Sequence, residues 1–276
     1  MTKRRNVPNP LQQRQLEDGG PWVLSDTPCS GRRVEFLTRG NSFLGFYYVV
    51  AATSKMGFES AMALEAQGKL NDSTPVRYVV EGTEVRMNHG RFKKVWQSSG
   101  RHLTNQVFLM VYGNFEAYLA DLVIDGLIEA EPGCDAYTEA RTLLIGRKWE
   151  GKIGAIDYRL NLGLKGRLLK EWFEGLEMHF LGTKCSQPMD FLEKVSDLRD
   201  RVVHYGSRVD AGLASSYPEA GFKEGDAIGF PFDVPTQLHF FLTHLSNLVD
   251  DAFCRKFEWP RELVGPENLL DPPAHN

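Results

Sequence analysis

After residue 98, apolar residues recur every three to four positions along most of the chain, and this period constrains the fold more than any other feature. Such spacing places apolar side chains on one face of an α-helix. The pattern is clearest in the last predicted helix, whose apolar face carries Leu238, Phe241, Leu242, Leu245, Leu248, Val249, Ala252 and Phe253. Several helices of this kind bury their faces against one another in a bundle. The sequence therefore predicts a mainly α protein.

The bundle is expected to contain further helices over residues 102–130, 136–148, 164–180 and 188–205, with a long loop over 211–233. Gly206 is suited to cap the C-terminus of the helix before this loop. Asp233 is suited to be the N-cap of the helix after the loop, and Pro235 to stand in its first turn. In the helix over 102–130 we expect Asn114, Asp121 and Asp125 to face solvent. Its opposite, core-facing stripe comprises Val107, Val111, Phe115, Tyr118, Leu119 and Leu122.

The first 97 residues differ in pattern from the bundle. Prolines and glycines in residues 1–31 predict a poorly ordered arm. A helix is expected over 41–67, closed by Gly68, and then a hairpin of strands 76–80 and 83–87. We therefore predict a smaller α+β N-terminal region over 1–97, a helical bundle over 98–260 and a tail over 261–276.

Charge and apolar runs limit the classes of function. With 32 basic and 36 acidic residues the formal charge is −4, so any nucleic-acid contact should come from a local basic patch. The longest apolar run, residues 43–52, is too short to span a bilayer, and no apolar segment typical of a signal peptide follows the basic N-terminus. The four cysteines form no CxxC pair, which favours free thiols over a zinc site. We expect a cytoplasmic protein without a membrane partner, metal or cofactor.

One charged residue is out of place in the helix over 188–205. Arg199 falls in the sector of its core-facing residues, which are Phe191, Leu192, Val195, Leu198, Val202 and Val203. A guanidinium stays charged and is seldom buried without a partner. Arg199 should therefore reach solvent, pair with Glu116 or Glu193, or face a cleft. On the other face lie Asp197, Arg201, His204 and Arg208, within about 60° of one another around the helix axis.

The segment Arg199-Asp200-Arg201-Val202-Val203-His204 resembles the Rx4-6H motif of the HEPN family (higher eukaryotes and prokaryotes nucleotide-binding). Residues 114–119, with Glu116, are similar to the glutamate-bearing first helix of several HEPN branches. The resemblance covers roughly residues 100–257.

The resemblance implies a HEPN-like bundle that cleaves RNA without a metal and leaves 2′,3′-cyclic phosphate ends. Arg199 and His204 would be catalytic, and the supporting or RNA-binding residues would be Asp200, Glu116, Arg201 and Arg208. It also implies a toxin or antiviral defence effector, with a possible antitoxin or regulatory partner. Residues five apart on a regular helix lie about 140° and 7.5 Å apart, so the two catalytic groups cannot meet on one phosphate if the helix stays regular. Similar proteins form dimers in which two copies of the motif line one cleft and the helix loosens near the histidine, so the resemblance also implies a homodimer.

Plainer interpretations remain open at each position. His204 suits a solvated helix C-terminus, where the helix dipole favours a cation. Arg199 suits a structural ion pair, Arg201 and Arg208 suit surface charges, and Glu116 either orients Arg199 or only pairs with it. Three functions therefore remain: a ribonuclease, a non-catalytic HEPN module that dimerises or binds a nucleotide, and an unrelated helical interaction protein.

Overall fold

The computed structural model describes residues 25–80, 83–171, 178–185, 187–204 and 208–264. Its helices are α2 (Gly31–Ala66), α3 (His89–Ala130), α4 (Ala136–Leu144), α5 (Trp149–Leu160), α6 (Leu164–Glu171), α7 (Pro188–His204), α8 (Ala211–Ser216), the 3-10 turn η1 (Pro218–Ala220) and α9 (Val234–Phe257). Strands pair as three antiparallel two-stranded sheets: β1 (Ser25–Cys29) with β6 (Glu262–Val264), β2 (Pro75–Val80) with β3 (Thr83–Asn88), and β4 (Met178–Phe180) with β5 (Thr183–Cys185). The predicted mainly α class is confirmed.

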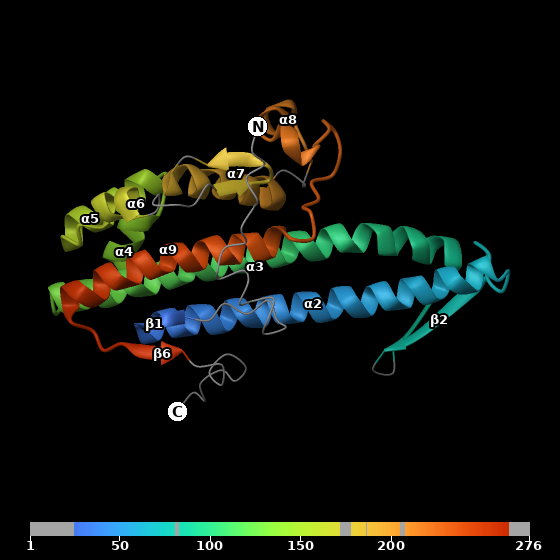
Figure 1. The fold of residues 1–276 in the computed structure, drawn as a ribbon, viewed down its shortest axis with the longest axis horizontal. Coiled ribbons are helices and arrows are strands. Elements are labelled where there is room, and N and C mark those ends of the chain that lie inside the picture. Colours follow the sequence, from blue (N-terminus) through green and yellow to red (C-terminus); the bar gives the residue numbers. More distant parts are fainter. Residues whose placement is uncertain (1–24, 81–82, 172–177, 186, 205–207, 265–276) are drawn as a thin grey trace, which may run out of the picture.

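Helices α2, α3 and α9 run side by side along the length of the molecule, and α4 to α8 form a second layer on the side of α3 and α9 away from α2 (Figure 1). At one end α2 and α3 extend past the other helices, and there they carry the predicted β2–β3 hairpin (Figure 1). The predicted apolar stripe of α3 is buried, as is the seam of α9 except for the partly buried Phe241. These stripes form one core with apolar side chains of α2.

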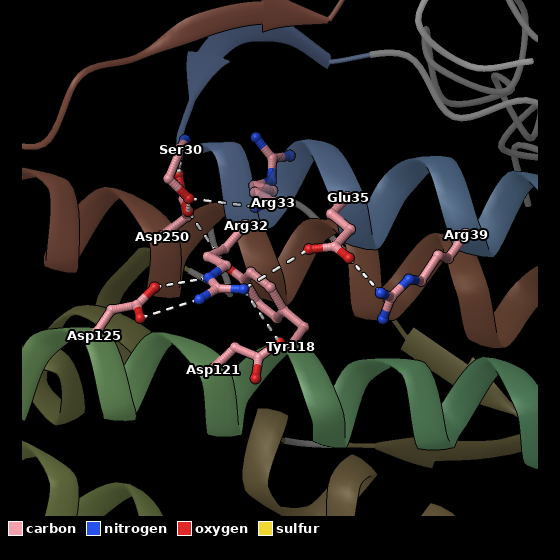
Figure 2. Close-up of polar contacts among 9 residues, drawn as sticks. All are labelled: Ser30, Arg32, Arg33, Glu35, Arg39, Tyr118, Asp121, Asp125 and Asp250. Carbon is pink, nitrogen blue, oxygen red and sulfur yellow. Dashed lines mark hydrogen bonds and ion pairs between the residues drawn. The ribbon is translucent and has the colours of Figure 1, made fainter. Parts of the chain in front are cut away.

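Helix α2 begins earlier than predicted, because Ser30 caps it and Asp250 of α9 holds the cap (Figure 2). The Ser30 hydroxyl accepts a hydrogen bond from the backbone N–H of Arg33 and donates one to the Asp250 carboxylate. The Ser30 backbone N–H also donates to Asp250, at 3.0 Å. The residues just before this cap form β1, which falls within the segment predicted to be a poorly ordered arm.

The face of α3 predicted to be solvated is instead partly covered by α2, and Asp121 and Asp125 remain 40% and 31% exposed. Asn114 is buried and donates to the backbone carbonyl of Phe36 at 2.8 Å. Arg32 bridges the two helices through a 2.7 Å ion pair with Asp125, and a weaker one at 3.7 Å with Asp121 (Figure 2). The prediction was wrong because these polar residues find their hydrogen-bond and ion-pair partners on a neighbouring helix. A polar helix face in the sequence does not show whether its partners are water or another helix.

Several boundaries also differ from the predictions. Helix α3 begins at His89, so the predicted boundary between residues 97 and 98 falls inside it, and α4 ends at Leu144 before an unexpected α5. Residues 178–180, expected to end a helix, form β4, and the predicted loop over 211–233 contains α8 and η1. Asp233 makes no side-chain cap to α9, whereas Gly68, with φ 69°, does follow the end of α2. Gly206 and residues 172–177 lie outside the described residues.

A close approach fixes the position of α9 against α2. Gly40 packs on the His239 ring so tightly that an added Cβ would lie 2.1 Å from Cε1 of His239. His239 is fully buried, and its Nε2 lies 3.3 Å from Oδ1 of Asn41. Burial lowers the pKa of His239 to about 4, so the ring is neutral at physiological pH.

Helix α3 is long and apolar enough to cross a bilayer by length and composition, and 56% of its most apolar stretch is buried inside the protein. Length and composition do not separate a core helix from a membrane helix. All four cysteines are free: Cys29, Cys185 and Cys254 are buried, and Cys134 is partly buried.

Candidate functional site

Helix α7 carries the predicted motif, and its core face is packed much as its sequence indicates. Phe191, Leu192, Val195 and Leu198 are fully buried. Val203, predicted to belong to the same face, is instead half exposed, whereas its neighbour Val202 packs against the core. Arg199 follows the buried Leu198, so the packing of α7 fixes where its guanidinium can reach.

The Arg199 guanidinium is held by two carboxylates. Nη2 lies 3.0 Å from Oε2 of Glu116 on α3, and Nη1 lies 2.6 Å from Oδ1 of Asp200. The side chain is 34% exposed, so it is neither buried in the core nor free in solvent. Partial burial opposes the charged form, but the hydrogen bonds and charges of Asp200 and Glu116 outweigh it and raise the pKa of Arg199.

A second layer of contacts fixes Glu116. Its other carboxylate oxygen lies 3.7 Å from Nζ of Lys152 on α5, and this ammonium lies 4.3 Å from the centre of the Trp149 ring. Trp149 is buried and donates from Nε1 to the Tyr112 hydroxyl at 2.9 Å. Burial, followed by the nearby Glu116 charge, raises the pKa of Tyr112. Glu193, the other candidate partner of Arg199, instead accepts a hydrogen bond from the backbone N–H of Trp149.

A cavity of about 830 Å³ opens beside Arg199, between α3, α4, α5 and α7. We call it the Arg199 cavity. Three carboxylates line it, those of Glu116, Glu193 and Asp200. Its cationic lining residues are Arg141, Arg147, Lys148, Lys152 and Arg199. The cavity therefore combines an excess of positive charge with a fixed guanidinium.

His204 lies away from this cavity. It is the last residue of α7, its side chain is exposed, and it does not line the cavity. Five residues along a helix correspond to a rotation of about 140° and a rise of about 7.5 Å. Within one chain, the structure therefore does not bring Arg199 and His204 to one point.

The predicted surface charges differ from one another. Arg201 is only 21% exposed, less than Arg199, because it pairs with Asp197 and with Asp210 at the start of α8. Arg201 is therefore a surface charge, as expected, but one that is paired with two exposed carboxylates and only partly solvated. Arg208 is exposed and donates to the backbone carbonyl of Gly225 at 2.9 Å.

The basic residues that line the cavity were not among the site residues predicted from the sequence. Arg141, Arg147, Lys148 and Lys152 lie within twelve residues, with Glu150 as the acidic residue among them. That local excess of cations was the available signal, but without a predicted α5 nothing placed it near Arg199. Among the described residues, no group of three or more His, Cys, Asp or Glu side chains is arranged to hold a metal ion.

Comparison of the chain with protein-family models, with curated proteins and with solved structures found no match.

Proposed function

We propose that the protein is a metal-independent endoribonuclease of HEPN type, with Arg199 and His204 as its catalytic residues. The observation that carries the proposal is the position of Arg199. Its guanidinium emerges from the apolar face of α7, is fixed by Glu116 and Asp200, and borders a cavity with an excess of cations. A fixed guanidinium beside a basic cavity suits the binding of a phosphodiester.

In this proposal the imidazole of His204 moves protons and the guanidinium of Arg199 stabilises charge. A base removes the proton from a ribose 2′-hydroxyl, and the oxygen attacks the adjacent phosphorus. The bond from phosphorus to the 5′-oxygen breaks, and that oxygen takes a proton from an acid. The products are a 2′,3′-cyclic phosphate and a 5′-hydroxyl. Arginine donors oppose the negative charge that develops on the non-bridging phosphate oxygens.

A second copy of the chain completes the site in this proposal. His204 lies beyond the cavity that Arg199 borders, at an exposed helix end where a partner chain can approach. Arg199 of one copy would then act with the His204 of the other. Degradation of cellular RNA by a cytoplasmic toxin or antiviral defence effector, under control of an antitoxin or regulatory partner, is the biological setting that the HEPN resemblance suggests.

One observation favours a second candidate, a non-catalytic HEPN module that binds a nucleotide. Both terminal nitrogens of the Arg199 guanidinium, Nη1 and Nη2, already bind carboxylates, so a substrate phosphate must share or displace them. If Glu116 and Asp200 never release the guanidinium, the cavity could still hold a nucleotide without cleaving RNA.

Product analysis separates the two candidates. The protein is incubated in excess EDTA with a single-stranded RNA and with DNA of the same sequence. We expect RNA fragments with 2′,3′-cyclic phosphate and 5′-hydroxyl ends and intact DNA, because DNA has no 2′-hydroxyl. Cleaved DNA, or RNA fragments with 5′-phosphate ends, would contradict the mechanism. Intact RNA together with nucleotide binding would favour the non-catalytic module.

A further inference from the structure

The Arg199 cavity contains a second group of cations that the proposed reaction does not use. Arg141 lies on α4, and Arg147 and Lys148 lie in the connection to α5. All three side chains are exposed. The proposed chemistry needs only Arg199 and His204, so these three cations need another explanation.

The carboxylates of the cavity do not neutralise these three cations. Glu116 pairs with Arg199 and Lys152, and Asp200 pairs with Arg199. Glu193 accepts the first backbone N–H of α5. In the described part of the chain, each of the three carboxylates is therefore engaged elsewhere, and none forms an ion pair with Arg141, Arg147 or Lys148.

Exposed apolar side chains border the same cavity. Tyr137 on α4 is 73% exposed, and Ile145, just before the two cations of the α4–α5 connection, is 62% exposed. Packing within the chain accounts for neither, because both side chains are largely in solvent. An exposed aromatic ring beside several cations is the combination with which proteins bind single-stranded nucleic acid, since a base stacks on the ring and the cations bind phosphates.

We propose that the Arg199 cavity holds a nucleotide of the RNA strand next to the cleaved bond. Its base stacks on Tyr137, and the neighbouring phosphates bind Arg141, Arg147 and Lys148. This inference rests on the proposed function for its ligand, RNA. In this inference Arg141, Arg147 and Lys148 are the local basic patch that a chain of net charge −4 needs in order to bind RNA.

Binding is measured by fluorescence anisotropy with a short, labelled, single-stranded 2′-O-methyl oligoribonucleotide, which keeps phosphates and bases but lacks the attacking hydroxyl. The triple variant Arg141→Gln, Arg147→Gln, Lys148→Gln is compared with wild type at several salt concentrations. Each lost phosphate contact lowers the slope of log K against log salt by about 0.7, so the triple variant should lose about 2. Tyr137→Leu should weaken binding about tenfold without changing that slope.

A matched control removes the same charge far from the cavity. Lys69, Arg91 and Lys94 are exposed near the hairpin end of α2 and α3, and their replacement by glutamine should leave binding nearly unchanged. Equal losses in the two triple variants, or full affinity in Tyr137→Leu, would overturn the inference. Competition by AMP at the same concentration as the oligonucleotide would also overturn it, in favour of a free-nucleotide site.

Cleavage assays keep this inference distinct from the proposed function. If the cavity triple variant cleaves RNA with the wild-type KM, the inference fails and the ribonuclease proposal stands. If the wild-type protein binds the oligonucleotide through the cavity but leaves RNA intact, the binding site stands and the ribonuclease proposal fails.

Discussion

At the scale of single residues, the two arginines of the motif exchange the surroundings that their sequence positions indicate. Arg199 was expected among apolar residues, yet it is more exposed than Arg201. Helical periodicity assigns each residue a direction but does not reveal what fills the space there. A cavity opens beside Arg199, and Asp197 and Asp210 pair with Arg201, so the sequence identified Arg199 as unusual without showing how it is accommodated.

We predict that Arg199→Ala abolishes RNA cleavage and lowers the free energy of unfolding by only about 1 kcal/mol, because its two ion pairs are partly exposed to solvent. Arg201→Ala should keep cleavage and cost a similarly small amount of stability, since its partners Asp197 and Asp210 are exposed and Asp210 still accepts the backbone N–H of Leu213. Initial cleavage rates and melts of both variants test this. Loss of cleavage in a well-folded Arg201→Ala with normal cleavage by Arg199→Ala would show that the motif was assigned to the wrong arginine.

Buried His239 gives a prediction about pH. Burial lowers its pKa to about 4 in the folded protein, whereas an unfolded histidine titrates near 6.5. Between these values the unfolded chain binds more protons, so the free energy of unfolding falls as pH decreases. The shifted pKa of His239 should therefore lower the free energy of unfolding by about 2 kcal/mol between pH 7 and pH 5.

The variant His239→Gln, whose amide can replace the Nε2 donor toward Asn41, isolates this contribution. Urea unfolding of wild type and variant at pH 7 and pH 5 gives the four free energies required. The variant should lose less stability than wild type on acidification. An equal loss in both proteins would mean that His239 is accessible to protons in the folded state.

At the scale of elements, the sequence predicts best where burial is one-sided and periodic. The α3 stripe, the α9 seam and the bounds of α7 follow this rule. The β2–β3 hairpin was predicted from its β-branched residues around Glu81-Gly82 and not from burial. The first turns of α3 are largely exposed, so they carry no apolar stripe to predict. Helix α5 was not predicted because it contains Gly151 and Gly154, and glycine disfavours a helix. Its buried residues Trp149, Ile153 and Ile156 nevertheless have helical spacing.

The β4–β5 hairpin was missed for a different reason. Its two-residue turn consists of Leu181 and Gly182, with φ values of 51° and 75°. Turns with two positive φ values usually contain Asn, Asp or Gly at the first position. A leucine there is unusual, so no turn signal indicated a hairpin, and residues 178–180 were assigned to the end of the helix over 164–180.

One contact of α2 with α9 is made by Asp250, which is buried and accepts both hydrogen bonds from Ser30 (Figure 2). We predict that Asp250→Asn lowers the free energy of unfolding by about 2 kcal/mol, because an amide offers one acceptor where the cap needs two. The adjacent Asp251→Asn is the control, since it removes ion pairs of the more exposed Arg255 and Arg261 and should cost less than about 1 kcal/mol. Equal costs in urea unfolding would show that the cap contributes little.

At the scale of the whole molecule, the proposed site requires two copies of the chain. A single chain holds Arg199 beside the cavity and His204 outside it. In a two-fold symmetric dimer, the same pair of helices forms both halves of the contact. We therefore expect a dimer whose interface includes α7, and a strict monomer at micromolar concentration in sedimentation would contradict the composite site.

Mixing two inactive variants tests the composite site itself. Arg199→Ala and His204→Ala should each be inactive alone, but a mixed dimer keeps one intact pair across the interface. Random exchange makes half of the dimers mixed, with one of two pairs intact, so about a quarter of the wild-type rate should return. Recovery should follow the rate of subunit exchange. No recovery, in a mixture shown to contain mixed dimers, would mean that both residues must act from one chain.

The most direct test of the central claim is the rate at which His204→Ala cleaves single-stranded RNA in excess EDTA, relative to wild type. His204 is exposed, so the variant should melt at the wild-type temperature. If the imidazole transfers protons in the reaction, the variant should be slower by about 10²- to 10⁴-fold. Cleavage by His204→Ala at the wild-type rate would contradict the claim, as would wild-type cleavage that stops when EDTA is added.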